Sequence, residues 1–201
     1  MLKTAAFILA GGESSRMGRN KALLEIDGVP LILRTAHVVE QAVAKPTIVG
    51  PREAFAALGF ECVEDDWPGA GPLGGIATAL RASGMEWNLV VACDMPYLTP
   101  EWLRHLVARA EASAAGAVIP QSEFGAEPLC ASYNKRAESA IRSALKRGVR
   151  KVMEGLDDLR IEKIAPVEWK PFDSGGRLFK NMNTPADYEE ARMRLSGPKK
   201  R

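Results

Sequence analysis

The stretch LAGGESSRMGRNK, residues 9 to 21, combines side-chain-free backbone with two cations. Gly11 and Gly12 let a ligand approach main-chain N–H groups closely, because no Cβ stands in the way. Successive N–H groups in such a turn attract anions, and Arg16 and Lys21 add two full positive charges. Donors of this kind stabilise a nucleoside triphosphate and its transition state. The stretch therefore predicts a phosphate-binding loop, with a plain strand-to-helix turn and solvated cations as the alternative.

Two common phosphate-binding motifs do not describe this loop. A Walker A motif needs Gly-Lys-Ser/Thr together, whereas the chain reads MGRNKAL, with no hydroxyl after the lysine. The stretch GAGPLG, residues 69–74, matches the pattern GxGxxG, but it follows acidic residues and contains Pro72. A dinucleotide fingerprint should instead follow an apolar strand. We expect neither motif to operate here.

Acidic residues follow two further apolar runs. Asp94 comes directly after NLVVAC, and Asp65 follows CVE. An aspartate at a strand end can hold Mg²⁺ against a triphosphate, because this cation prefers carboxylate and phosphate oxygens. The competing explanations are a turn or cap carboxylate at Asp94, which Pro96 follows closely, and a solvated acidic turn at Asp65.

Short apolar runs alternate with helical patterns along the chain. We expect strands at 4–9, 46–50, 60–64, 88–93, 116–120 and 129–133, and helices at 31–43, 74–83, 100–113, 134–148 and 185–195. Such alternation predicts an α/β fold: a three-layer α/β/α sandwich with a mostly parallel, Rossmann-like sheet. Ligands of these sheets bind beyond the carboxyl ends of the strands. The ends after Leu9, Val63 and Cys93 are therefore the places to look for a site.

Helix boundaries carry recognisable signals. Thr99 and Thr184 are good N-cap residues, each followed by a proline at the first helical position. Gly148 is expected just after the end of the fourth helix.

The bulk composition indicates an ordinary globular enzyme or binding protein. The chain has 201 residues, 46% hydrophobic and 26% charged, with a formal net charge of +2. We expect one domain over residues 1–195 and a flexible basic tail at 196–201. Near-neutral charge argues against nucleic acid as a partner, and no apolar run is long enough for a membrane span. Three scattered cysteines suggest reduced, mostly buried thiols in a cytoplasmic protein.

Five stretches together resemble the molybdenum cofactor guanylyltransferase family of nucleotidyltransferases. They are LAGGESSRMGRNKALLEIDGVPL, GPLGGI at 71–76, CDMPYL at 93–98, EPLCASY at 127–133 and NMNTPADY at 181–188. The resemblance runs from Phe7 to Tyr188 and implies a sheet of the nucleotide-diphospho-sugar transferase type. It also implies transfer of GMP from GTP to the phosphate of molybdopterin, which forms molybdopterin guanine dinucleotide and releases pyrophosphate.

The resemblance further implies roles for individual residues. The catalytic residues would be Arg16, Lys21 and Asp94, with Asp94 holding Mg²⁺. The nucleotide-binding residues would be Leu9, Ala10, Gly11, Gly12, Lys21, Asp65, Gly71 and Asp94. Asn181 and Asn183 match the family's acceptor-binding asparagines, although an Asn before Thr-Pro is equally a loop or capping device. The implied partners are GTP, molybdopterin, and transiently the proteins that deliver molybdopterin or receive the product.

Guanine selection has a residue hypothesis of its own. Guanine presents N1–H beside an exocyclic amino group, and one carboxylate can accept from both, so we assign the base reading to Asp65. The reading LAGG supports GTP, since cytidylyltransferase relatives usually have L-A-A-G there. At Gly50 the family can carry a ligand-contacting asparagine, so that contact would be missing.

Several alternatives stay open. A CTP-dependent molybdopterin cytidylyltransferase and a sugar-phosphate nucleotidyltransferase share the fold. A non-catalytic nucleotide-binding or cofactor-carrier protein is the alternative of another class. The basic run KRGVRKVM offers Arg147, Arg150 and Lys151 as phosphate or pterin contacts, but a solvated face explains it better.

Overall fold

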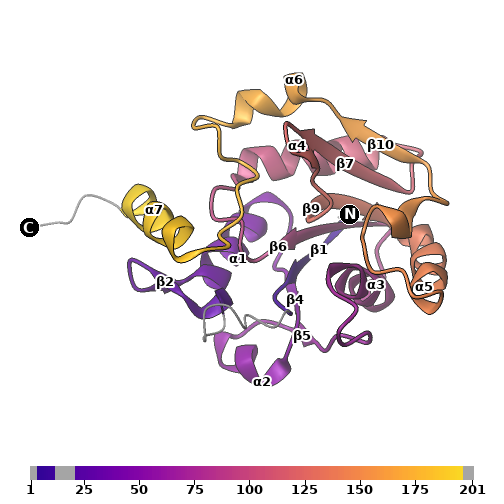
Figure 1. The fold of residues 1–201 in the computed structure, drawn as a ribbon, viewed down its shortest axis with the longest axis horizontal. Coiled ribbons are helices and arrows are strands. Elements are labelled where there is room, and N and C mark those ends of the chain that lie inside the picture. Colours follow the sequence, from indigo (N-terminus) through magenta and orange to yellow (C-terminus); the bar gives the residue numbers. More distant parts are fainter. Residues whose placement is uncertain (1–3, 12–20, 197–201) are drawn as a thin grey trace, which may run out of the picture.

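The computed structural model describes residues 4–11 and 21–196. A mixed β-sheet forms the middle layer of the molecule (Figure 1). The strands of this sheet follow the order β10-β7-β9-β6-β1-β4-β5, and β8 pairs with β7 outside this order. The strands are β1 (Thr4–Leu9), β4 (Thr47–Val49), β5 (Cys62–Val63), β6 (Trp87–Ala92), β7 (Ala117–Ser122), β8 (Gly125–Ala126), β9 (Cys130–Asn134) and β10 (Ile161–Ile164). All six strands expected from the sequence are confirmed.

The sheet is mostly parallel, as predicted. Strand β1 pairs in parallel with β4 and β6, β4 with β5, and β7 with β10, whereas β9 runs antiparallel to both β6 and β7. The register places Leu9 opposite Ala92 on one side and Val49 on the other, and Val49 opposite Val63. The carboxyl ends of β6, β1, β4 and β5 therefore lie at one level along a single edge.

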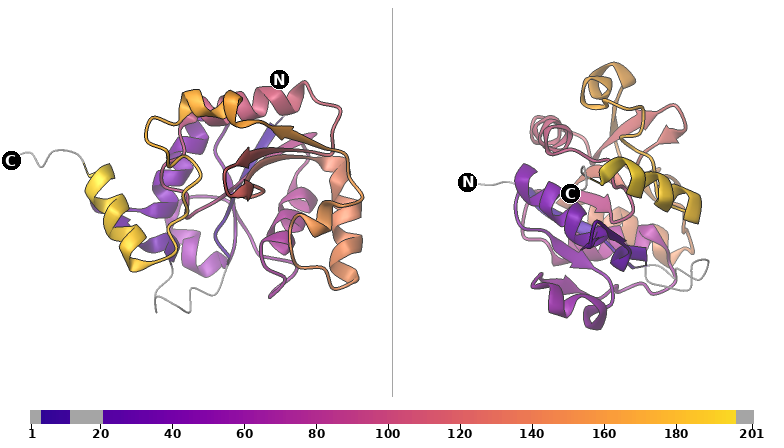
Figure 2. Two further views of the ribbon diagram at one scale, coloured as in Figure 1. Left: turned by 45° about the horizontal axis from the view of Figure 1, so that its top comes forward. Right: turned by 90° about the vertical axis from the view of Figure 1, so that its left-hand side faces the viewer.

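Helices cover both faces of the sheet (Figure 2). On one face lie α1 (Leu31–Ala42) and α4 (Pro100–Glu111); on the other lie α3 (Pro72–Ala82) and α5 (Glu138–Lys146). Fully buried Trp102 and Leu106 of α4 belong to the first core, and Leu73 and Ile141 belong to the second. This is the predicted three-layer α/β/α arrangement. Among the described helices, none is long and apolar enough to cross a bilayer.

The helix-boundary signals act as predicted. The Thr99 side chain accepts from the Trp102 amide at the start of α4. Thr184 forms a reciprocal capping box with Asp187 at the start of α7 (Pro185–Leu195). Gly148 directly follows Arg147, the C-cap residue of α5, and has a φ of +88°. Helix α5 itself begins later than expected, because a 3₁₀ turn occupies residues 135–137.

Several short elements were not predicted. They are β2 (Glu25–Ile26), β3 (Val29–Pro30), α2 (Arg52–Phe55), α6 (Pro166–Trp169) and the 3₁₀ helices η1 (Lys21–Leu23), η2 (Ala56–Leu58), η3 (Lys135–Ala137), η4 (Glu154–Leu156) and η5 (Lys170–Phe172), together with β8 and β10. The β2–β3 hairpin turns at Asp27 and Gly28, whose φ angles are +53° and +74°. An Asp-Gly pair with two positive φ angles is a strong hairpin signal, and the sequence does carry it.

Helix α7 packs on this hairpin and closes one end of the molecule (Figure 1). Ile26 and Leu31 form a small core with Met182 and Ala191. The Tyr188 hydroxyl donates to the Glu25 carbonyl at 2.6 Å. The segment before α7 is thereby held against the opening part of the chain.

Replacing Gly50 by alanine should lower the free energy of unfolding by about 1–3 kcal/mol, the usual cost of overpacking. A Cβ there would lie 3.1 Å from the carbonyl carbon of Ala10 and 3.2 Å from the Gly11 nitrogen, both backbone atoms. Urea denaturation measures the change. Gly84→Ala is the matched control, because a Cβ at exposed Gly84 meets nothing within 4 Å. Equal stability of the two variants would contradict the tight approach of β4 to β1.

Candidate active site

Three of the predicted strand ends meet at one edge of the sheet, and backbone hydrogen bonds extend the pairing beyond it. The Cys93 amide donates to Leu9 O at 3.1 Å, the Ala10 amide to Val49 O at 2.9 Å, and the Gly50 amide to Val63 O at 3.0 Å. The turns after β6, β1, β4 and β5 are therefore held side by side. A Cβ at position 50 would lie 3.1 Å from the Ala10 carbonyl carbon, so a larger residue there would require the Ala10 backbone to shift slightly.

The centre of this edge is an ammonium group shared by two oxygens. Lys21 Nζ donates to Asp94 Oδ2 at 3.1 Å and to Asn183 Oδ1 at 2.9 Å. The side chains of Lys21 and Asp94 are 18% and 21% exposed. Three predicted site residues from distant parts of the chain are thus brought into contact.

Two hydrogen bonds fix the turn that carries Asp94. The Met182 amide donates to the Asp94 carbonyl at 2.8 Å, which ties the segment before α7 to the turn after β6. On the other side of that turn, the Thr35 hydroxyl of α1 lies 3.3 Å from the Cys93 carbonyl. Both α1 and the segment before α7 therefore hold the turn, which fixes the backbone that carries the Asp94 carboxylate.

Cys93, next to Asp94, takes no part in the chemistry. Its thiol is buried, and burial raises its pKa to about 12, with a further contribution from the Asp94 charge. At neutral pH it is a neutral thiol, which is a poor nucleophile and metal ligand. All three cysteines are free, and Cys93 and Cys130 are buried, as the sequence suggested.

Asp65 has a structural task that the sequence did not reveal. Its Oδ1 accepts from the Trp67 amide at 2.9 Å and from the Thr78 hydroxyl at 3.0 Å. Thr78 is fully buried in α3, and it also accepts from the Asp66 amide. Among the described residues, no group donates to Asp65 Oδ2 and no cation pairs with this carboxylate, whereas neighbouring Asp66 pairs with Arg81. Asp65 therefore keeps one oxygen for a ligand.

Gly71 precedes α3 with a φ of +67°, a conformation that favours glycine, and Pro72 starts the helix. Close packing continues inside the helix, where a Cβ at Gly75 would lie 3.2 Å from a methyl of Leu9. The first turn of α3 is thereby held against the end of β1.

The remaining predicted loop residues divide into two groups. Leu9 and Ala10 are buried at the end of β1, and Gly11 is exposed beside them. Gly12 and Arg16 lie outside the described residues. Of the predicted phosphate-binding loop, the structure thus describes Leu9, Ala10 and Gly11 at its start and Lys21 at its end.

The donor set at this edge fits a metal that arrives with a triphosphate. The described part of the chain contains no group of three or more His, Cys, Asp or Glu side chains that could hold a metal ion. Asp94 is a single carboxylate beside Lys21. Mg²⁺ is commonly bound by one or two carboxylates together with substrate phosphates. A resident metal centre, in contrast, would need more ligands than these residues supply.

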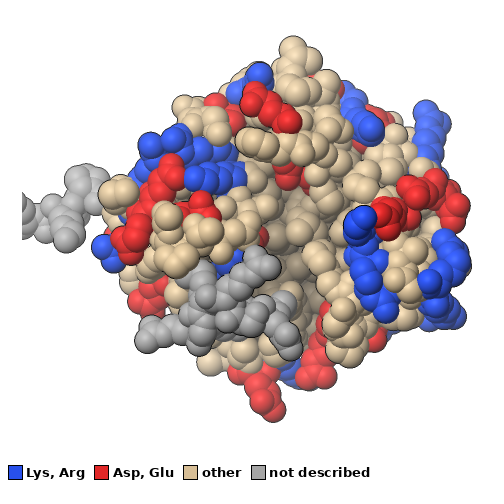
Figure 3. Space-filling view, in the orientation of Figure 1, with Lys and Arg blue, Asp and Glu red and all other residues tan. Residues whose placement is uncertain are grey.

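A cavity of about 1160 Å³ has Asn183 among its lining residues. It is lined by residues of the β7–β8 hairpin, of the stretch from α6 to α7, and of α7. Asn181 lines it too, and its side-chain oxygen is buried without a hydrogen-bond partner among the described residues. The face in Figure 3 is hollowed in its middle. A second substrate can therefore be accommodated beside the Lys21 group.

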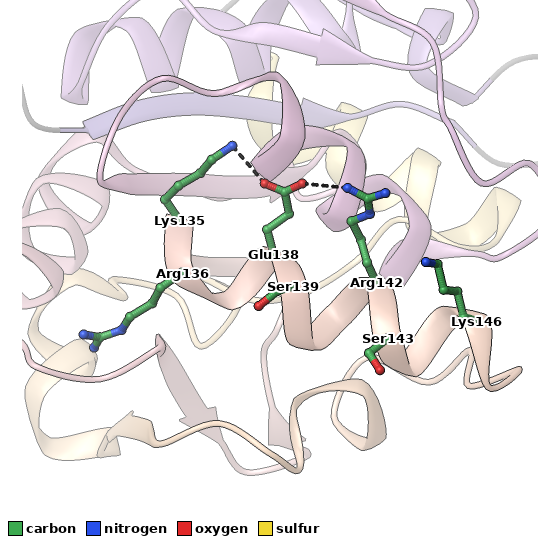
Figure 4. A pocket seen from close by; sticks show the side chains of 7 residues that line it. All are labelled: Lys135, Arg136, Glu138, Ser139, Arg142, Ser143 and Lys146. Atoms are coloured by element: carbon green, nitrogen blue, oxygen red, sulfur yellow. Dashed lines mark hydrogen bonds and ion pairs between the residues drawn. The ribbon is translucent and has the colours of Figure 1, made fainter.

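A second, smaller hollow lies along α5 (Figure 4) and contains none of the predicted site residues. Lys135 and Arg142 both point to Glu138, at 3.0 and 3.3 Å. The basic run that follows α5 also has local partners, since Arg150 donates to the Leu145 and Val149 carbonyls and Lys151 pairs with Glu154. These cations are occupied within their own segment.

Comparison with known proteins agrees with this geometry. Residues 6–161 match the MobA-like NTP transferase domain. A protein of Pelotomaculum thermopropionicum named "Probable molybdenum cofactor guanylyltransferase" is 35% identical over 96% of this chain and 94% of its own. The "Molybdenum cofactor guanylyltransferase" of Syntrophotalea carbinolica is 30% identical over 96% and 92%.

A solved structure shows the same fold over nearly the whole chain. The molybdopterin-guanine dinucleotide biosynthesis protein A of Archaeoglobus fulgidus superimposes with a TM-score of 0.83 at 29% identity, covering 94% of this chain and 97% of that one. The sheet order, the edge that gathers Lys21, Asp94 and Asn183, and these similarities lead to one conclusion. This chain belongs to the MobA-like NTP transferase family and is a nucleotidyltransferase.

Proposed function

We propose that this enzyme transfers GMP from GTP to the phosphate of molybdopterin, forming molybdopterin guanine dinucleotide and releasing pyrophosphate. The observation that carries the proposal is the Lys21 ammonium held between Asp94 and Asn183 at the carboxyl edge of the sheet. The names of the full-length relatives supply the nucleotide and the acceptor. The enzyme would act in the cytoplasm, and its three free cysteines agree with a reducing compartment.

The reaction requires positioning and charge stabilisation more than bond-making by the protein. An oxygen of the acceptor phosphate bonds to the α-phosphorus of GTP, while the bond from that phosphorus to the bridging oxygen breaks. The electron pair leaves on pyrophosphate, so negative charge grows there. This charge would be offset by Lys21, Arg16 and the amides of Gly11 and Gly12. The nucleotide-binding site would be shaped by Leu9, Ala10 and Gly71. The attacking phosphate is already an anion, so no general base is needed.

Mg²⁺ is the metal we propose, bound through Asp94 and the nucleotide's phosphates. When bound, it would neutralise phosphate charge. Asp94 suits this task because its turn is fixed from two sides and its carboxylate faces a lysine rather than further acidic ligands. Lys21, which contacts Asp94, would bind the incoming phosphate in this scheme.

The acceptor would bind on the Asn183 side, where the large cavity begins. Asn183 contacts Lys21, and Asn181 contributes an unpartnered carbonyl-type oxygen. Proteins that deliver molybdopterin or receive the product would meet the enzyme transiently. CTP is the alternative nucleotide, but the relatives are named for guanylyl transfer and LAGG favours GTP. A non-catalytic carrier would not need the assembled Lys21 and Asp94.

The nucleotide preference is tested directly. Purified enzyme, Mg²⁺ and molybdopterin should release pyrophosphate far faster with GTP than with CTP or ATP, and the dinucleotide should be detectable by mass spectrometry. Faster turnover with CTP would make the enzyme a cytidylyltransferase. GTP binding without pyrophosphate release would instead support a carrier.

Asp94→Asn and Lys21→Ala should each lower kcat by about 10²–10³-fold, the usual loss when one group that stabilises transition-state charge is removed. Steady-state pyrophosphate release measures this, with circular dichroism to show that the fold is intact. Lys151→Ala is the matched control for the lysine, since Lys151 is 81% exposed and pairs only with Glu154 among the described residues. Near-normal turnover of either variant would remove that residue from the mechanism.

Asp65→Asn should weaken the preference for GTP over ATP more than it lowers kcat. The asparagine oxygen can still accept from Thr78 and Trp67, while the amide group replaces the oxygen left for guanine's paired N–H donors. The ratio of kcat/KM values for the two nucleotides is the readout. Asp66→Asn is the control, because Asp66 pairs with Arg81 on the surface. An unchanged ratio in Asp65→Asn would leave Asp65 only its structural role.

A further inference from the structure

The hairpin formed by β7 and β8 presents two unusual side chains to the large cavity. Phe124, at the tip of the hairpin, is 98% exposed, the largest exposure among the big hydrophobic residues that the structure describes. Glu127, just after β8, is half-buried and has no cation paired with it among these residues. Both side chains line the cavity that begins at Asn183.

A single serine holds both groups in place. The buried Ser122 hydroxyl donates to Glu127 Oε1 at 2.6 Å and accepts from the Phe124 amide at 3.1 Å. The Glu127 main chain is fixed as well, because its amide donates to the Pro120 carbonyl and its carbonyl accepts from the Cys130 amide. The aromatic ring and the carboxylate are therefore carried by a braced turn.

Glu127 is prepared for a ligand that donates hydrogen bonds. Only Oε1 accepts a hydrogen bond from a described residue, so Oε2 is left for another donor. Burial raises the pKa of the Glu127 carboxyl, because the ionised form loses water, and the Ser122 hydroxyl only partly offsets this. A ligand with two adjacent N–H groups would complete the hydrogen bonding of the ionised carboxylate.

The acceptor in the proposed function has such an edge. A pterin ring carries a ring N–H next to an exocyclic amino group, and it offers a flat π-face. An aromatic side chain can stack on that face, and one carboxylate can accept from both donors. The phosphate end of the acceptor must lie near Lys21, and the cavity runs from Asn183, which Lys21 contacts, to the hairpin.

We propose that Phe124 and Glu127 form the pterin-recognition site of this enzyme, with Phe124 stacking on the ring and Glu127 accepting from its paired N–H groups. Ser122 is the positioning residue of the pair. The proposal rests on the proposed function, since the acceptor phosphate and the pterin are ends of one substrate.

The first test separates acceptor binding from nucleotide binding. Glu127→Gln and Phe124→Leu should each raise the KM for molybdopterin by about tenfold, as expected for replacing one hydrogen-bond acceptor by a donor or for losing a stacking ring. The KM for GTP should stay within about twofold, because both residues line the cavity on the side proposed for the acceptor. Phe124→Tyr, which keeps the ring, should retain the wild-type KM. Glu123→Gln controls for charge, since Glu123 is an exposed carboxylate of the same hairpin, 3.7 Å from Lys170.

The second test uses paired inhibitors. 6-Hydroxymethylpterin should compete with molybdopterin, and its 2-oxo analogue, 6-hydroxymethyllumazine, should compete less well, because it lacks the amino group. Glu127→Gln should erase this difference. Phe124→Leu should weaken both inhibitors equally.

The outcomes distinguish the two proposals. A wild-type enzyme that makes no dinucleotide from GTP and molybdopterin overturns the proposed function. A wild-type enzyme that makes it, with Glu127→Gln and Phe124→Leu variants of unchanged acceptor KM, overturns only the pterin site. Equal inhibition by the pterin and the lumazine does the same for Glu127.

Discussion

The contact on which this site depends is the Lys21 ammonium shared by Asp94 and Asn183. Its three residues come from the start of η1, the turn after β6 and the segment before α7, so one small group joins distant parts of the chain at the edge of the sheet. The contact is also an electrostatic balance: without a triphosphate, the lysine charge is met by the aspartate. A metal-bound triphosphate would give each partner a new counter-charge, which suits a site that must open and re-form with every turnover.

That contact requires the sheet edge to be level. The register pairs Leu9 with both Ala92 and Val49, and Val49 with Val63. Three backbone hydrogen bonds continue this pairing past the strand ends. The level edge in turn depends on Gly50, where even a methyl group would press on the Ala10 backbone. A side chain at position 50 would require the Ala10 backbone to shift, and in the proposed function the nucleotide contacts come from the neighbouring turns instead.

Much of this could be predicted from the sequence because it is local. Apolar runs set the strands, threonine and proline set the starts of α4 and α7, and the rule for parallel sheets placed Leu9, Val63 and Asp94 on one edge. What could not be predicted depends on contacts distant in sequence. Thr78 looks like one more small residue of a packed helix until the fold brings its hydroxyl to Asp65. Glu127 reads as one acid in EPLCASY until the hairpin turns it toward the cavity and Ser122 takes one oxygen. The β2–β3 hairpin is different, because its Asp27-Gly28 turn signal is local and stands in the sequence itself.

Asp65 and Glu127 share one construction at two places around the Lys21 group. In each, a buried hydroxyl, from Thr78 or Ser122, occupies one carboxylate oxygen, and no described cation neutralises the charge. Guanine and pterin also share one feature, a ring N–H beside an amino group. Two similar carboxylates for two similar edges raise the question of what keeps the substrates in order. The carboxylates cannot do it, because either ring satisfies either of them. The surroundings would have to: Gly11 lies beside the end of β1, whereas the exposed Phe124 lies on the β7–β8 hairpin that lines the large cavity. In the proposed arrangement the carboxylate would recognise the donor pair, while the distance from the Lys21 group and the exposed Phe124 would determine which ring is held.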